Sequence, residues 1–236
     1  MATTAPNVYT RRWFSTFLGR IDAGLVAREI EFLRRQLPAG AHVLDLCCGP
    51  GRHAGPLTDA EYRVTGLDRD AVALKDAARS APGAMFIRGD MRRIPLALHS
   101  VDAVICMWQS FGHFDADGNR AVLAELARVL VPNGQLVLDL YHRDFHAAHV
   151  GERTIERDDE RVHESRAMTG ERLRVRLRYE STGSEESFDW ALYTPASLAL
   201  LAGPVGLRPR LSCSEFDEAI EPSGERARMQ VVLAKH

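Results

Sequence analysis

The chain has 236 residues, of which 45% are hydrophobic and 26% are charged, and its formal net charge is -2. These values are typical of a single globular domain that buries a substantial core without disulfides or metal ions. A net charge this close to zero gives no electrostatic attraction toward nucleic acid, so a nucleic-acid partner is not expected. Composition does not distinguish a monomer from a homodimer.

Neither a membrane span nor a secretory signal is predicted. No run approaches the roughly 20 apolar residues that a transmembrane helix needs, and the N-terminus lacks the apolar centre of a signal peptide. We therefore expect a cytoplasmic protein. The segment before Asp22 contains arginines and hydroxyl residues but no acid, which is also typical of organelle transit peptides.

The first half of the chain alternates between strand-like and helical patterns. A helix is predicted from Asp22 to Gln36, with Asp22 as its cap and Pro38 after its end. Five short apolar runs then alternate with helical segments, which predicts a parallel sheet of the α/β type. The predicted strands are His42–Leu46, Arg63–Leu67, Met85–Arg88, Val101–Met107 and Gln135–Leu140, and the helices between them are Arg52–Ala60, Ala71–Arg79 and Arg120–Leu130. Val131–Gly134 is expected to form the turn before the fifth strand.

Residues 152–190 have a different pattern, which predicts an antiparallel β insertion within a single domain of residues 1–236. Arginines alternate with apolar residues from Arg172 to Tyr179, so one face of this strand is charged and the other apolar. The charged face is interpreted as solvated, with an anionic-substrate platform as the alternative. A helix follows from Thr194 to Leu201, and the last ten residues read as a final strand.

The stretch "VLDLCCGPGRHAGPL", residues 43–57, runs from a strand into a glycine turn. Such a turn before a helix presents free backbone N–H groups to a ligand. Asp45 would repel a pyrophosphate but attract an ammonium group, which disfavours a dinucleotide. The neighbouring Cys47 and Cys48, like Cys106 and Cys213, lack the spacing of a zinc site, so reduced thiols and no metal are expected.

Two further acids end the next two strands. Asp68 follows the second strand, where a carboxylate can accept both hydroxyl groups of a ribose, and Asp90 follows the third, where it can accept from an exocyclic amino group. Because the carboxyl ends of parallel strands meet at one edge, Asp45, Asp68 and Asp90 should share a crevice. A cation, a ribose and an adenine together describe S-adenosylmethionine.

From about Phe32 to Leu140 the sequence resembles the class I S-adenosylmethionine-dependent methyltransferases of small-molecule type. Asp45, Gly49 and Gly51 match the first motif of that family, and Cys47 replaces its first glycine. The resemblance implies a Rossmann-like, doubly wound, mostly parallel seven-stranded sheet with S-adenosylmethionine as cofactor. It assigns the ribose to Asp68, the adenine edge to Asp90 and Met91, and the methionine moiety to the backbone at Cys106.

The segment after the fourth strand is expected to lie over the methyl group of the donor. Trp108, Phe111 and Phe114 can attract a sulfonium through their ring faces, or they can pack the loop. His113 is the candidate base for an amine or hydroxyl acceptor, although in-line methyl transfer can proceed without a dedicated base.

The candidate acceptor pocket lies outside the glycine motif. The family resemblance suggests that the β insertion caps this pocket and that Tyr9, Trp13 and Phe17 close the donor site. His142, His146 and His149 are spaced as one helical face, where a pocket or surface role is favoured over metal binding because no H-E-x-x-H pattern is present.

Methyl transfer to nitrogen or oxygen of a small molecule is the leading interpretation. A nucleic-acid methyltransferase would be expected to carry N-P-P-Y or D-P-P-Y where this chain has "MWQS", residues 107–110. A non-catalytic S-adenosylmethionine sensor is a further alternative. A nicotinamide-dependent oxidoreductase is disfavoured by Asp45.

Overall fold

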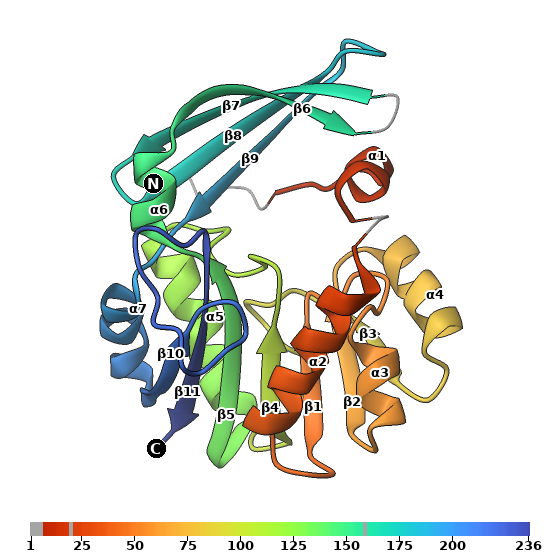
Figure 1. Cartoon of the computed structure of the whole chain (residues 1–236). Helices are drawn as coiled ribbons and strands as arrows, with labels where there is room; N and C mark the ends of the chain where they lie inside the picture. Colours follow the sequence, from red (N-terminus) through yellow and green to blue (C-terminus); the bar gives the residue numbers. More distant parts are fainter. Residues whose placement is uncertain (1–6, 19–20, 158–159) are drawn as a thin grey trace.

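The computed structural model describes residues 7–18, 21–157 and 160–236, and these residues form a large sheet and a smaller one (Figure 1). The seven strands of the large sheet are β1 (His42–Leu46), β2 (Arg63–Asp68), β3 (Met85–Arg88), β4 (Val101–Cys106), β5 (Leu130–Tyr141), β10 (Leu207–Cys213) and β11 (Arg228–Lys235). The four strands of the second sheet are β6 (Gly151–Arg157), β7 (Glu160–Thr169), β8 (Arg172–Tyr179) and β9 (Glu185–Ala191). The expected fold, with an antiparallel insertion after the fifth strand, is confirmed.

The strand order of the large sheet is β10-β11-β5-β4-β1-β2-β3. All neighbours from β5 to β3 are parallel, and β11 is antiparallel to both β5 and β10. The chain leaves β1 toward β3 and then returns to β4 on the other side of β1. This reversal opens a crevice at the carboxyl ends of β1 and β4, the usual ligand position in such sheets.

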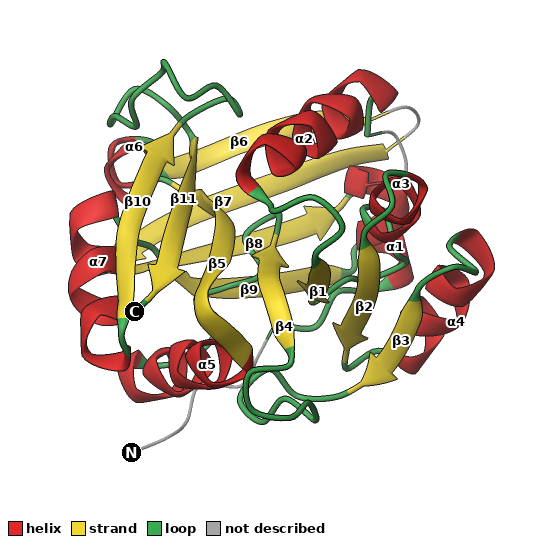
Figure 2. Ribbon diagram, turned by 90° about the horizontal axis from the view of Figure 1, so that it is seen from below, coloured by secondary structure: helices red, strands yellow, loops and turns green. Residues whose placement is uncertain are grey.

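Helices cover both faces of the large sheet (Figure 2). On one face α2 (Ala23–Gln36) and α3 (Ala54–Asp59) pack on alternate residues of the central strands, including Val43 and Ile105. On the other face α5 (Ala116–Val129) and α7 (Pro195–Ala202) pack on the intervening residues, including Leu44 and Val104. The central strands are buried on both sides, which is why they read as continuous apolar runs. No helix among the described residues is long and apolar enough to cross a membrane.

The second sheet lies over the carboxyl ends of the large sheet (Figure 1). In β8 the predicted alternation is confirmed: Arg174, Arg176 and Arg178 are exposed, while the alternate positions from Leu173 to Tyr179 are buried. We call the face that carries Leu173 the inner face and the face that carries Arg176 the outer face.

The N-terminal segment, residues 7–18, packs on this inner face. It contains α1 (Arg11–Trp13) and the π-helix η1 (Phe14–Leu18). Tyr9, Trp13 and Phe17 join the apolar cluster of the inner face, and the Tyr9 ring stacks on Phe188 with centroids 5.1 Å apart. These three aromatic residues therefore pack on the second sheet, and their expected role in closing the donor site stays a prediction.

Several predicted boundaries differ from the structure, each for a local reason. Helix α3 begins at Ala54 rather than Arg52, because Gly49 and Gly51 before it are in left-handed conformations. Helix α5 begins at Ala116 because the side chain of Asp115 accepts the Gly118 N–H and caps it. Strand β5 begins at Leu130, and the predicted turn at residues 131–134 is an irregularity within that strand.

The predicted helical face of three histidines is not formed. The helix α6 spans only Arg143–Ala148, with His142 as its N-cap in an extended conformation and His149 as its C-cap. Helix α4 (Ala71–Ser80) ends one residue after the predicted end at Arg79, and α1 was not predicted. Strand β10 was also not predicted, because its sequence "LRPRLSC" contains a proline and two arginines.

Gly112 connects the loop after β4 to the second sheet, since its carbonyl accepts the Ala191 N–H. Its φ is +102°, and a Cβ there would lie 2.4 Å from the Ala191 oxygen. We expect Gly112→Ala to lower the free energy of unfolding by about 2–3 kcal/mol, measured by urea denaturation. Gly170→Ala is the control, because Gly170 has φ +60° but no neighbour within 4 Å, so only about 1 kcal/mol of strain is expected. Equal losses would contradict the role of the Ala191 contact.

Candidate functional site

The turn after β1 has an unusual backbone. Cys47, Gly49 and Gly51 have φ values of 60°, 52° and 83°, so Cys47 adopts the left-handed conformation that favours glycine. A Cβ on Gly51 would lie 3.0 Å from the Cβ of Ala77, whereas a Cβ on Gly49 would have nothing within 4 Å. Gly51 therefore allows close packing on α4 (Ala71–Ser80), and Gly49 faces open space that a ligand can fill.

Asp45 lies at the carboxyl end of β1 and is only 2% exposed. Its Oδ2 has no hydrogen-bond partner among the described residues. Burial raises the pKa of Asp45 to about 6, although the charges of His53 and Arg52 oppose this shift. A buried carboxylate without a donor is costly, and a cationic ligand group would satisfy it.

Asp68 is linked directly to the turn. Its Oδ2 accepts the Gly49 N–H at 2.9 Å, and its Oδ1 accepts the Asp70 N–H at 2.9 Å. The ends of β1 and β2 are therefore held together by one carboxylate, and Asp45, Gly49 and Asp68 lie at the same edge as the sequence predicted.

Met91 and Cys106 also belong to this edge, whereas the carboxylate of Asp90 is occupied. The Cys47 Sγ lies 4.0 Å from the Met91 Sδ, and the fully buried Cys106 is among the groups that raise the pKa of the Cys47 thiol, after burial itself. Asp90 binds Arg92 with Nη2 to Oδ2 at 2.7 Å, and this contact lowers its pKa. Its proposed contact with an adenine would have to compete with Arg92.

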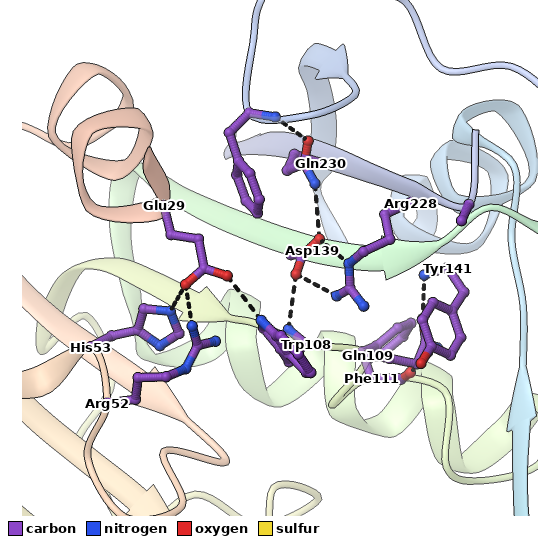
Figure 3. Close-up of polar contacts among 12 residues, drawn as sticks. Glu29, Arg52, His53, Trp108, Gln109, Phe111, Asp139, Tyr141, Arg228 and Gln230 are labelled. Atoms are coloured by element: carbon purple, nitrogen blue, oxygen red, sulfur yellow. Dashed lines mark hydrogen bonds and ion pairs between the residues drawn. The ribbon is translucent and has the colours of Figure 1, made fainter. Parts of the chain in front are cut away.

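The loop after β4 is held in a strained conformation. Trp108 and Gln109 both have φ of 58°, which is uncommon for residues with side chains. The Trp108 N–H donates to the Asp139 Oδ2 at 3.1 Å (Figure 3). The Gln109 N–H donates to the Asp139 backbone oxygen at 2.9 Å. The Gln109 side chain donates to the Phe111 oxygen at 3.0 Å and accepts from the Tyr141 N–H. These contacts fix the loop from both sides.

Two buried carboxylates hold Trp108 in place (Figure 3). Glu29 on α2 accepts the Trp108 indole N–H at 2.8 Å and also pairs with Arg52 and His53. On the other side, Arg228 pairs with the fully buried Asp139. The guanidinium groups of Arg52 and Arg228 lie 5.1 and 5.3 Å from the Trp108 ring, so cationic side chains already contact this aromatic.

Sequence reasoning missed Glu29 and Asp139. A signal for Asp139 existed: "VLDL" occurs twice, at residues 43–46 and 137–140, with the acid at the same place in each strand. A charged residue within an apolar run is buried only when it is paired or binds a ligand. Asp139 is paired with Arg228, whereas the Asp45 side chain has no ion-pair partner among the described residues.

Phe111 and Phe114 are buried and pack against other side chains of the protein. Phe111 is fully buried against Tyr193, with ring centroids 5.7 Å apart. Phe114 is 4% exposed and lies under the guanidinium of Arg92 at 4.4 Å. Of the three aromatic residues after β4, only Trp108 lines the cavity described below.

His113 is buried and connects the N-terminal segment to the loop. The Asn7 amide is oriented by Asp189, whose N–H it accepts at 2.8 Å, so its Nδ2 donates to the His113 Nδ1 at 3.0 Å. Burial lowers the pKa of His113 to about 4, with Arg69 and Arg172 adding to the effect. The imidazole is therefore neutral at pH 7 with its proton on Nε2, and it would have to give up Asn7 to accept a proton at Nδ1.

The histidines around α6 make protein contacts. His146 Nε2 lies 3.2 Å from the Ala227 oxygen, and His149 Nδ1 lies 2.7 Å from the Phe145 oxygen. Within residues 7–18, 21–157 and 160–236, no three His, Cys, Asp or Glu side chains are grouped as metal ligands would be.

A cavity of about 240 Å³ lies between the inner face of the second sheet, the N-terminal segment and the ends of β4 and β5. Trp108, Gln109 and Tyr141 line it from the large sheet, and Tyr9 and Trp13 from the N-terminal segment. The Cys47 Sγ of the glycine turn lies 4.0 Å from the backbone oxygen of Ser110, which directly follows the cavity-lining Gln109. The cavity and the turn are thus neighbouring sites.

Sequence comparisons match part of the chain to a known family. A profile of the family described as "Methyltransferase domain" matches residues 43–134. The dTDP-3-amino-3,6-dideoxy-alpha-D-glucopyranose N,N-dimethyltransferase of Streptomyces fradiae is 32% identical over 160 residues, which are 65% of this chain and 62% of that enzyme. Demethylmenaquinone methyltransferase of Renibacterium salmoninarum is 38% identical over 42% of this chain and 40% of its own. The chain thus covers less than two thirds of either relative.

Solved structures share the fold. The CcbJ methyltransferase from Streptomyces caelestis has a TM-score of 0.77 at 19% identity, covering 90% of this chain and 89% of that one. The amino pentose methyltransferase CalS10 from Micromonospora echinaspora has a TM-score of 0.73 at 21% identity, covering 98% and 100%. Residues 43–134 thus match a methyltransferase family, and the fold of the described residues is that of solved methyltransferase structures.

The raised pKa of Asp45 makes stability depend on pH in a defined direction. The folded chain keeps a proton at Asp45 up to about pH 6, whereas an unfolded Asp releases it near 3.8, so stability falls as the pH rises between these values. Asp45→Asn removes this loss. We expect the variant to gain up to about 3 kcal/mol over the parent at pH 7 and nothing below about pH 4, by urea denaturation across pH without ligand. A pH-independent difference would contradict the assignment.

The buried pair of Asp139 and Arg228 predicts a large loss for Asp139→Asn, because Arg228 then keeps its charge without a partner. The expected decrease in the free energy of unfolding is about 3 kcal/mol. Asp117→Asn breaks the exposed pair with Arg120 and should change stability by less than about 0.5 kcal/mol. Chemical denaturation of both variants measures the two changes in the free energy of unfolding, and similar values would contradict the prediction.

Proposed function

We propose that the protein transfers a methyl group from S-adenosylmethionine to a nitrogen of a small-molecule acceptor. The observation that carries this proposal is the buried Asp45 carboxylate, which lacks a hydrogen-bond partner beside a turn with open space at Gly49. An amino-acid ammonium group is the ligand that this arrangement fits, since it would satisfy Asp45 where a phosphate would be repelled.

The donor would lie along the edge formed by β1, β2 and β4. Asp45 holds its ammonium group, the backbone at Cys47, Gly49, Gly51 and Cys106 contacts its methionine part, and Asp68 binds its ribose hydroxyls. To do so, Asp68 would exchange its contact with the Gly49 N–H for the ribose. Asp90 and Met91 lie at the adenine end. The donor supplies an electrophilic methyl group on a sulfonium.

The acceptor would occupy the cavity next to this edge. Trp108 and Gln109 line the cavity and directly follow β4, so an acceptor there lies near the methionine end of the donor. Methyl transfer is an in-line displacement, and its rate depends on alignment and the exclusion of water. The loop at Trp108 suits this requirement because its hydrogen bonds to Asp139, Phe111 and Tyr141 hold it in one conformation.

Relatives support nitrogen as the methylated atom. Two curated relatives are N,N-dimethyltransferases of amino sugars, that of Streptomyces fradiae and one of Saccharopolyspora spinosa that is 27% identical over 80% of both chains. A catalytic role for His113 stays a prediction. Because burial lowers its pKa to about 4, a base at this position would already be unprotonated above pH 5.

We further propose that residues 1–236 act as one cytoplasmic methyltransferase domain, as a monomer or homodimer, in which residues 152–190 cap the acceptor. A nucleic-acid acceptor is disfavoured by the small size of the cavity, about 240 Å³. A non-catalytic sensor is distinguished by donor binding without turnover on any amine.

Titration calorimetry with S-adenosylmethionine, S-adenosylhomocysteine and NAD tests the donor site. We expect the first two to bind and NAD not to bind, and we expect Asp68→Ala to weaken binding at least about tenfold, ~1.4 kcal/mol. Asp76→Ala is the matched control, because Asp76 is an exposed acid on α4 that pairs only with Arg79 among the described residues. Equal binding of all three ligands would refute the assignment.

A further inference from the structure

The side chains that line the cavity change from apolar to charged across the second sheet. On the inner face, β8 and β9 contribute apolar and aromatic side chains such as Val175 and Phe188. The register places Val175 opposite Arg166 on β7, and Glu164 on β7 opposite Arg153 on β6. The cavity is therefore aromatic toward β9 and charged toward β6.

The charged end is built around one buried carboxylate. Glu164 is 6% exposed and accepts from the Arg166 Nε at 2.8 Å, from the Arg166 Nη2 at 3.2 Å, and from the Arg153 Nε. The Arg166 Nη1 lies 3.4 Å from the Nδ1 of His146. Two guanidinium groups thus share one carboxylate, and the cluster keeps an excess positive charge.

Neighbouring groups do not cancel this excess. Burial and the charge of Arg166 lower the pKa of His146 to about 3, so its ring is neutral. A third arginine, Arg157 on β6, also lines the cavity. Glu164 is the one acid among the described residues that line it.

A buried ion cluster of this kind adds little to stability, because the cost of desolvation offsets the attraction between its members. Apolar side chains of similar size would serve the fold equally well at these positions, as they do on β8. The guanidinium of Arg153 uses its Nε for Glu164, and its side chain is 56% exposed, so its outer N–H groups can reach a ligand. Forked N–H donors of this type match oxyanions.

We propose that Arg153 and Arg166 bind an oxyanion of the methyl acceptor, so that the acceptor is a small amine with a phosphate or carboxylate group at its other end. This inference rests on the proposed function and deepens it. The aromatic end of the cavity, at Trp108 and Tyr9, receives the amine, which attacks the methyl group in its neutral form.

Titration calorimetry with inorganic pyrophosphate and with succinate tests the proposal without a methyl donor. We expect pyrophosphate, succinate or both to bind with a Kd of about 1 mM or below, and Arg153→Gln to weaken binding about tenfold. Arg174→Gln, the same charge change at an exposed arginine of β8 that lines neither pocket to which Arg153 contributes, should leave binding unchanged. Tighter binding of pyrophosphate indicates a phosphorylated acceptor, and tighter binding of succinate indicates a carboxylate.

Glu164→Gln gives a second readout with the opposite sign. Removal of the competing carboxylate should strengthen anion binding several-fold, whereas a purely structural cluster would lose order and weaken it. Arg153 is half-exposed, so Arg153→Gln is expected to fold even if Arg166→Gln does not. The proposal is overturned if neither anion binds, if Arg174→Gln weakens binding as much as Arg153→Gln, or if Glu164→Gln weakens it.

The proposed function can fail separately. Titration with S-adenosylhomocysteine depends on Asp45 and Asp68, which lie outside the arginine cluster. A chain that binds this nucleoside but neither anion keeps its methyltransferase assignment and loses the anionic acceptor. A chain that binds anions but not the nucleoside loses the assignment and keeps the anion site.

Discussion

The ion pair between Asp139 and Arg228 determines the shape of the edge on which both sites are built. Asp139 is fully buried, so its charge is stable only with Arg228 beside it. The Asp139 side chain accepts the Trp108 N–H, and its backbone oxygen accepts the Gln109 N–H. The left-handed loop after β4 follows from these contacts, and with it the position of the cavity wall.

The scaffold of the site was predictable from local sequence, whereas the contacts that fix it were not. The bounds of β1 and β3 agree with the prediction, because short apolar runs between turns define buried strands. The start of α3 was misplaced because left-handed residues delay the first helical turn. Arg228 pairs with a residue 89 positions earlier, and no local pattern encodes a contact of that range.

In the second sheet, too, local sequence predicted some features of the site and not others. Period-two alternation in β8 identified its charged and apolar faces, and the exposed arginines there are solvated as predicted. The arginines that line the cavity come from β6 and β7, where charged residues occupy both faces and alternation is weak. Which charges face inward became visible only through the pairing of β6 and β7 with β8.

Asn7 pairs through its side chain with the backbone of Asp189, on the free edge of β9, as a neighbouring strand would. This contact holds the N-terminal segment across the cavity. A route past this edge of β9 requires Asn7 to detach and Tyr9 to unstack from Phe188, a rearrangement of the microsecond to millisecond kind. A methylated product that leaves by this route would be released only as fast as the N-terminal segment opens.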